Sequence, residues 1–122
     1  MKLVLRIALG LAGLLFIGIG LSFWANPATP AARLGIEAAN ALGTSSLRAD
    51  MAAFFGVAGF LTLMAVVRSN ARLLTAPLLM IAVALTGRII TVIIDGYTPD
   101  MMQPIVIEAV LLALLAAGRR LI

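Results

Sequence analysis

Four long apolar segments, separated by short polar ones, dominate the hydropathy pattern of this chain. They cover residues of about 3–24, 47–67, 73–94 and 101–117. A helix needs about 20 apolar residues to cross the hydrocarbon core of a bilayer, and the segments approach or meet that length. The pattern therefore predicts an all-α fold, a four-helix transmembrane bundle that forms a single membrane domain over residues 1–122.

The first apolar segment has an alternative interpretation as a cleaved signal peptide, because small residues follow it at Ala25, Ala28 and Ala31. Its apolar region is longer than the ~7–15 residues of a signal peptide, which favours a membrane span. Trp24 lies at its far end, where an interfacial anchor is expected. Glycines recur along this segment and suit close helix approach, although glycine is common in membrane helices generally.

One extended polar segment, residues 25–46, separates the first two spans. Asn26-Pro27 and Thr29-Pro30 end the first helix and restart the chain. The Ala-rich residues of about 30–42 then predict a short surface helix in the outer first loop, which Gly43 would end. A plain connector without a helix is the alternative.

Composition places the chain in a membrane. It is 63% hydrophobic and 11% charged, against a charged fraction of about 25% in soluble domains. Cysteine and histidine are both absent, which excludes a disulfide framework and removes the usual ligands of zinc, haem and iron–sulfur groups. We therefore expect no cofactor and no metal. The net charge of +4 does not indicate nucleic acid, because the basic residues sit between apolar runs.

The distribution of charge predicts how the bundle is oriented. Three of the five polar segments carry basic residues and no acid, and four spans place these three segments on one side of the membrane. The positive-inside rule makes that side cytoplasmic, so we expect a bacterial inner-membrane protein with both termini in the cytoplasm. The residues concerned are Lys2, Arg6, Arg68, Arg72, Arg119 and Arg120.

Two opposite charges inside the third and fourth spans are the main candidate site. Arg88 lies seven residues before Asp95, and Glu108 lies seven residues after Met101, so both are about 10 Å below the outer interface. An ionisable group at such a depth needs a partner or water. We expect an Arg88–Glu108 pair, with Asp50 or Asp95 as a further partner. The full candidate cluster is Arg48, Asp50, Arg88, Thr91, Asp95 and Glu108.

Two functions fit this cluster. The favoured hypothesis is a non-enzymatic binding or accessory subunit, in contact with membrane lipids, in which the ion pair fixes the order of the helices. Its Gly and Ala faces would support a homo-oligomer or a larger membrane complex. The alternative is an enzyme or carrier for a lipid-soluble molecule, whose anionic or polar head group would meet Arg88 while Glu108 handles a proton. A path for ions or protons is disfavoured, because the inner part offers only Thr62, Thr75 and Thr86.

Several short motifs resemble a known family. Arg48-Ala49-Asp50 precedes Phe54-Phe55-Gly56, Gly87-Arg88 precedes Asp95-Gly96, and Glu108 follows Pro104. This combination resembles the bacterial small-membrane-protein family catalogued as domain of unknown function forty-three forty-five. The resemblance extends over nearly the whole chain. It implies a four-helix inner-membrane architecture and draws attention to the charged members of the cluster, but it implies no substrate.

Overall fold

The computed structural model describes residues 2–122, and these residues form helices joined by short turns, without a strand. Four continuous helical stretches are long and apolar enough to cross a membrane, which confirms the predicted all-α class: Lys2–Ala25, Ala41–Val67, Ala71–Asp95 and Pro99–Leu121. The individual elements are α1 (Lys2–Ala25), α2 (Ala28–Arg33), α3 (Ala41–Ser46), the π-helix η1 (Leu47–Met51), α4 (Ala52–Val67), η2 (Ala71–Leu74), α5 (Thr75–Asp95), η3 (Pro99–Met101) and α6 (Met102–Leu121).

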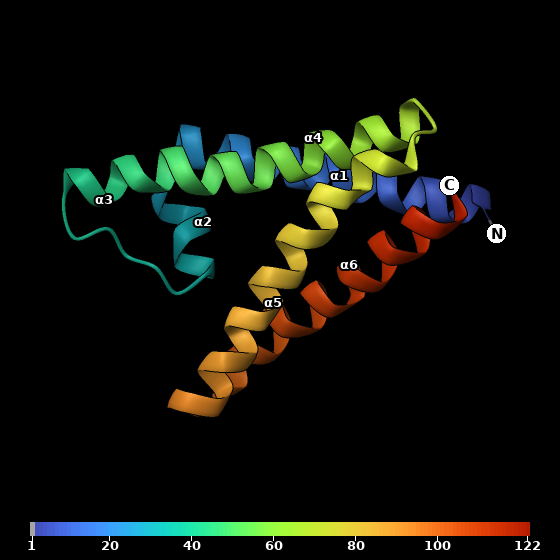
Figure 1. Ribbon diagram of the computed structural model, residues 1–122. Helices are drawn as coiled ribbons and strands as arrows, with labels where there is room; N and C mark the ends of the chain where they lie inside the picture. The colour runs from blue at the N-terminus through green and yellow to red at the C-terminus, as the bar shows by residue number, and fades with distance from the viewer. Residues whose placement is uncertain (1) are drawn as a thin grey trace.

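Helices α1 and α4 run antiparallel and form the most extensive contact in the molecule (Figure 1). Glycines on both helices create this contact. A Cβ atom built on Gly59 would lie 2.6 Å from the Gly13 carbonyl oxygen, and one built on Gly20 would lie 3.0 Å from the Gly56 nitrogen. The two backbones therefore touch directly, as small residues allow between membrane helices.

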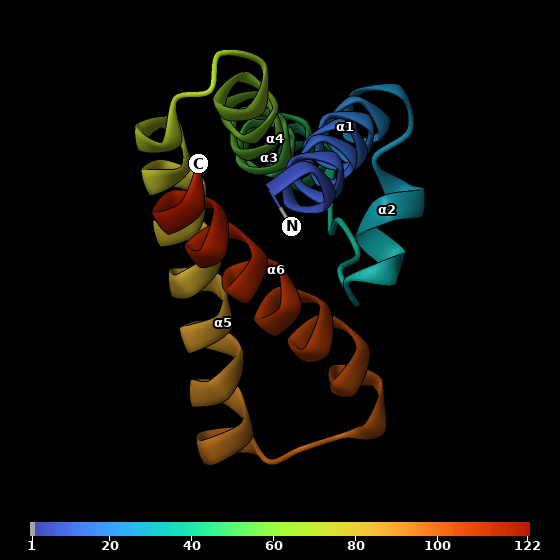
Figure 2. The same cartoon turned by 90° about the vertical axis from the view of Figure 1, so that its right-hand side faces the viewer.

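Helices α5 and α6 meet the α1–α4 pair at one end only. Helix α5 starts beside it at the end that carries both termini and runs obliquely away, and α6 runs back to the same end, where the chain terminates (Figure 1). The view in Figure 2 shows that α5 and α6 also diverge from each other toward the turn that joins them. The main core accordingly lies at the end where all four helices meet, and its buried residues are Leu5, Leu9, Ala65, Leu74, Ile81 and Leu115.

A second, smaller core fixes α2 at the opposite end of α1. Phe23 is fully buried there, together with Ala31 of α2, Leu47 and Ala52. Because Ala31 is only 1% exposed, α2 is packed against the bundle and does not lie free on its surface. This packing fixes the position of the last turn of α2, which ends at Arg33.

The short helix of the first loop differs from the prediction. It covers Ala28–Arg33 in place of residues 30–42, and residues 34–40 are irregular. Gly35 adopts a φ of +74°, a left-handed conformation that ends the helix. Asn40 then caps a new helix by accepting a hydrogen bond from the Gly43 nitrogen at 3.0 Å. Gly43 therefore lies in the first turn of the second long helix and does not end a surface helix.

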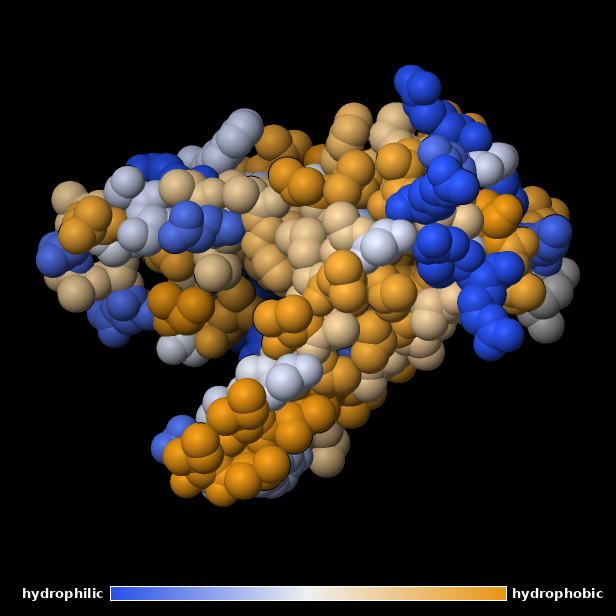
Figure 3. Space-filling model, in the orientation of Figure 1, coloured by the Kyte–Doolittle hydropathy of each residue, from blue (hydrophilic) through white to orange (hydrophobic). Residues whose placement is uncertain are grey.

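Hydrophilic residues gather at the end of the molecule that carries the two termini (Figure 3). The three purely basic segments lie at this end, because they are the start of α1, the turn after α4 and the end of α6 (Figure 1). Some of these side chains join helices to one another. Arg6 donates to the Val66 carbonyl oxygen at 2.6 Å and to Ser69 Oγ at 2.9 Å, and Arg119 donates to Thr75 Oγ1 at 3.0 Å.

Candidate functional site

The divergence of the helices leaves a cleft between the α1–α4 pair and the α5–α6 pair. Its volume is about 850 Å³, and residues of α1, α2, α4, α5 and α6 line it. Most of the lining side chains are apolar. The polar ones are Ser22, Asn26, Thr29, Arg33, Arg88 and Glu108.

Four phenylalanines form one wall of the cleft, with Phe55 at their centre. The Phe55 ring makes edge-to-face contacts with Phe16 at 5.3 Å and with Phe54 at 5.2 Å, and it stacks on Phe23 at 5.9 Å between ring centroids. Aromatic rings prefer these arrangements, and each pair is worth about 0.5–1.5 kcal/mol beyond burial. The wall is therefore a fixed apolar surface of the kind that would contact hydrocarbon.

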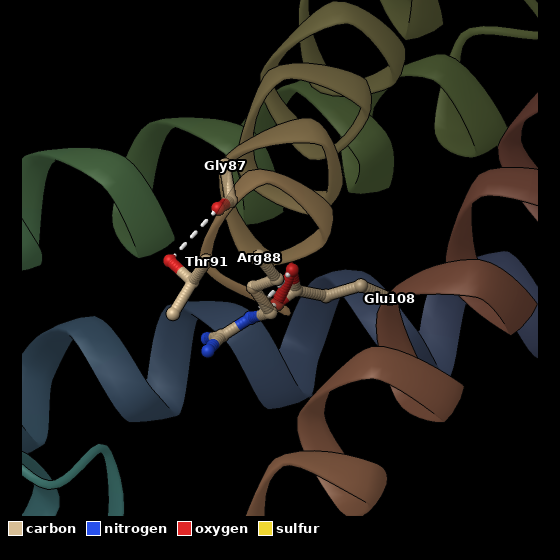
Figure 4. Close-up of polar contacts among 4 residues, drawn as sticks. All are labelled: Gly87, Arg88, Thr91 and Glu108. Atoms are coloured by element: carbon tan, nitrogen blue, oxygen red, sulfur yellow. Dashed lines mark hydrogen bonds and ion pairs between the residues drawn. The ribbon is translucent and has the colours of Figure 1, made fainter. Parts of the chain in front are cut away.

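Arg88 of α5 and Glu108 of α6 meet on the opposite side of the cleft (Figure 4). The Arg88 Nε atom lies 2.6 Å from Glu108 Oε2 and 2.9 Å from Oε1, so a single N–H group serves both carboxylate oxygens. The Glu108 side chain is 12% exposed and the Arg88 side chain is 34% exposed. The structure thus brings together the two charges that the sequence placed at equal depth.

The two Nη groups of Arg88 point away from the carboxylate (Figure 4). They donate no hydrogen bond to any residue between 2 and 122, and neither is a buried unsatisfied atom. Four N–H donors of this guanidinium consequently remain available to the cleft that Arg88 lines.

The other members of the predicted cluster lie apart from this pair. Thr91 donates its hydroxyl to the Gly87 carbonyl oxygen at 3.1 Å, within α5 (Figure 4). Asp50 and Asp95 are exposed, and Arg88–Glu108 is the only ion pair within residues 2–122. The prediction that one of these two aspartates joins the pair is therefore wrong. Asp95 is two helical turns from Arg88, about 10 Å along α5, and α5 has diverged from the helix that follows Asp50.

Arg48 belongs to a different contact. Its Nε donates to the Trp24 carbonyl oxygen at 3.2 Å, while Trp24 Nε1 donates to the Arg48 carbonyl oxygen at 3.0 Å. This reciprocal pair of hydrogen bonds joins the end of α1 to η1. Arg48 therefore holds two helix ends together and does not line the cleft.

Arg33 is the ionisable cleft residue that the sequence did not single out. Within the predicted helix of residues 30–42, Glu37 would follow Arg33 at the i,i+4 spacing of a helical ion pair. In the structure the helix ends at Arg33, and no ion pair forms between these two residues. The Gly35 that follows was the available signal, since it separates the two charges.

The cleft closes toward the end that carries the termini. The remaining space between Leu9, Ile81 and Leu115 there has a volume of about 10 Å³, at the lower limit for a single water molecule. Thr62 donates to the Ala58 carbonyl oxygen and Thr86 to the Ala82 carbonyl oxygen, each at 2.7 Å. These hydroxyls are bonded within their own helices, so the cleft ends in apolar packing.

Four helices long and apolar enough to cross a membrane support a helical membrane protein, and the cleft with its ion pair is the distinctive feature of the structure. The chain belongs to the family described as Domain of unknown function (DUF4345), which matches residues 4–118. This match confirms the family resemblance drawn from the sequence, and the family description assigns no activity. No curated protein and no solved structure matches the chain.

Proposed function

We propose that this protein is a membrane binding protein that takes up a lipid-soluble molecule, with a polar or anionic head group, in the cleft between its two helix pairs. The observation that carries the proposal is the pair of unbonded Nη groups of Arg88 on the wall of an otherwise apolar cleft of about 850 Å³. Small-molecule sites typically measure about 300–1,000 Å³ and combine apolar walls with a few polar groups that orient the ligand.

The ion pair suits Arg88 to this task. Glu108 accepts only from Nε, which fixes the guanidinium plane and leaves the Nη edge free. Arginine stays charged, and this edge can donate two parallel hydrogen bonds to an anion. The head group would therefore bind at Arg88, while the hydrocarbon part lies along the phenylalanine wall.

The charge distribution suggests where the ligand would enter. All six charged residues at the end with the termini are basic, so the positive-inside rule favours a cytoplasmic location for that end in a bacterial inner membrane. The cleft would then lie in the periplasmic half of the membrane. A molecule of the outer leaflet could reach it laterally between the diverging helices.

Binding is favoured over catalysis by the state of the polar groups in the cleft. Both Glu108 oxygens accept from Arg88 Nε, so the carboxylate is already engaged within the protein. Ser22 donates its hydroxyl to the Ile19 carbonyl oxygen at 2.6 Å. No nucleophile hydrogen-bonded to a base therefore lines the cleft within the described part of the chain.

The proposal is tested by filling the cleft. Ala84 lines it from α5, whereas the neighbouring Val83 is 72% exposed and does not line it. We expect native mass spectrometry of the detergent-released protein to detect a lipid-sized adduct on the wild type and on Val83→Trp, but not on Ala84→Trp. An adduct retained equally by Ala84→Trp and Val83→Trp would exclude the cleft as the binding site.

A further inference from the structure

We infer that the ligand of the cleft is a phospholipid with one net negative charge, whose phosphate lies between Arg33 and Arg88. This inference rests on the proposed function, because it names the chemical class of the molecule that the cleft would bind.

Arg33 supplies a second cation to the cleft. It is the last residue of α2, it is exposed, and its side chain forms no hydrogen bond or ion pair within residues 2–122. Packing of Ala31 into the smaller core holds this end of α2 in place. Both arginines line the cleft, Arg33 from α2 and Arg88 from α5, and Figure 2 shows these two helices on opposite sides of the molecule.

The ionisable residues that line the cleft determine the charge of a matching ligand. They are Arg33, Arg88 and Glu108, which leaves one net positive charge. A monoanion compensates that charge, a zwitterion brings no net charge, and a dianion leaves one negative charge in excess. Such differences are costly in apolar surroundings, where charges interact strongly and are poorly solvated.

The opposite placement of the two arginines favours a phosphate over a carboxylate as the anionic group. The oxygens of a phosphodiester project in different directions from a tetrahedral centre, so they can accept from cations on two walls. A carboxylate presents both oxygens in one plane to one guanidinium. The apolar remainder of the cleft and its open side suit the acyl chains of a membrane lipid.

The experiment measures head-group preference on the full chain. Delipidated protein is mixed with micelles containing phosphatidylglycerol and phosphatidylethanolamine of identical acyl chains in equal amounts, and the bound lipid is identified by native mass spectrometry. We expect about a tenfold preference of the wild type for phosphatidylglycerol, because its net negative charge compensates the net positive charge of the cleft and the zwitterion does not. Arg33→Gln should abolish most of this preference, and Arg33→Lys should retain part of it.

Arg48→Gln is the matched control, since Arg48 lies near the same end of the bundle but is bonded to Trp24 and does not line the cleft. It should keep the wild-type preference. An unchanged preference in Arg33→Gln would overturn the inference, while the loss of the adduct in Ala84→Trp would still support the proposed function. Phosphatidic acid can carry a second negative charge, so stronger binding of phosphatidic acid than of phosphatidylglycerol would refute a ligand with one net negative charge. A wild type that retains no lipid at all would overturn both proposals.

Discussion

The contact between Arg88 and Glu108 can be measured as a coupling energy between α5 and α6. The perturbations are Arg88→Leu, Glu108→Leu and the double variant. Each single change leaves one charge without its partner, because Arg88–Glu108 is the only ion pair within residues 2–122. The double change removes both charges and places two apolar side chains on the walls of an apolar cleft.

The expected magnitudes follow from the exposure of the two side chains. Removing one partner of a fully buried pair costs about 3–5 kcal/mol, and a hydrogen bond to a charged group contributes about 1.5–3 kcal/mol. Arg88 is 34% exposed, so Glu108→Leu should lower the free energy of unfolding by about 1.5–3 kcal/mol. Glu108 is only 12% exposed, so Arg88→Leu should cost more, about 2–4 kcal/mol.

The assay is unfolding of the delipidated protein in mixed micelles by increasing amounts of a denaturing detergent, followed by helical circular dichroism. The double variant should unfold within about 1 kcal/mol of the wild type, which gives a coupling energy of at least about 2.5 kcal/mol. Thr91→Val is the control, because the Thr91 hydroxyl bonds only within α5, and it should change stability by less than about 0.5 kcal/mol.

A coupling energy below about 0.5 kcal/mol would refute the contact between the two side chains. The double variant also separates the structural role of the pair from its proposed binding role. If it folds like the wild type but retains no lipid, the pair serves the ligand. If it folds and still retains the same lipid with the same head-group preference, Arg88 is not the anchor of the head group.

Two further predictions concern helix packing and orientation. A Cβ atom on Gly59 would meet backbone atoms of α1 at 2.6 and 2.8 Å, so Gly59→Ala should destabilise the fold by about 1–3 kcal/mol. A Cβ atom on Gly56 would meet nothing within 4 Å, so Gly56→Ala should be neutral or slightly stabilising. Equal losses of stability in the two variants, measured in the same unfolding assay, would refute the direct backbone contact. The chain contains no cysteine, so Tyr97→Cys and Leu121→Cys each introduce a single thiol, at exposed positions of opposite ends of the molecule. A membrane-impermeant maleimide should label only Tyr97→Cys in intact bacteria. Labelling of only Leu121→Cys would show that the proposed orientation is reversed.

The number of long apolar helices and the Arg88–Glu108 contact could both be predicted from the sequence. Hydropathy alone determines how many segments are long enough to span a bilayer. The rise of a helix then places two residues at equal distances from one turn at equal heights, which was sufficient to pair Arg88 with Glu108. No assumption about the packing of the helices was needed for either result.

The errors arose where local geometry or helix divergence decided the outcome. The Ala-rich pattern suggested one helix across residues 30–42, but the left-handed Gly35 and the Asn40 cap divide that segment. Asp50 was expected near Arg88 because both lie toward the same end of the bundle. Height along the bundle says nothing about lateral distance, and the two helices diverge there.

The cleft itself follows from the placement of small residues, which hydropathy does not reveal. Gly13 and Gly59 bring α1 and α4 into backbone contact over much of their length. The half of α5 that lies away from the termini has no comparable contact, since a Cβ atom on Gly87 would meet nothing within 4 Å, and Ala109 and Ala113 of α6 are exposed. The α5–α6 pair is therefore bridged at this height by the long Arg88 side chain. Because an arginine reaches farther than an alanine, the same ion pair that connects the two helices also keeps them apart, and a structural role and a binding role for Arg88 are compatible.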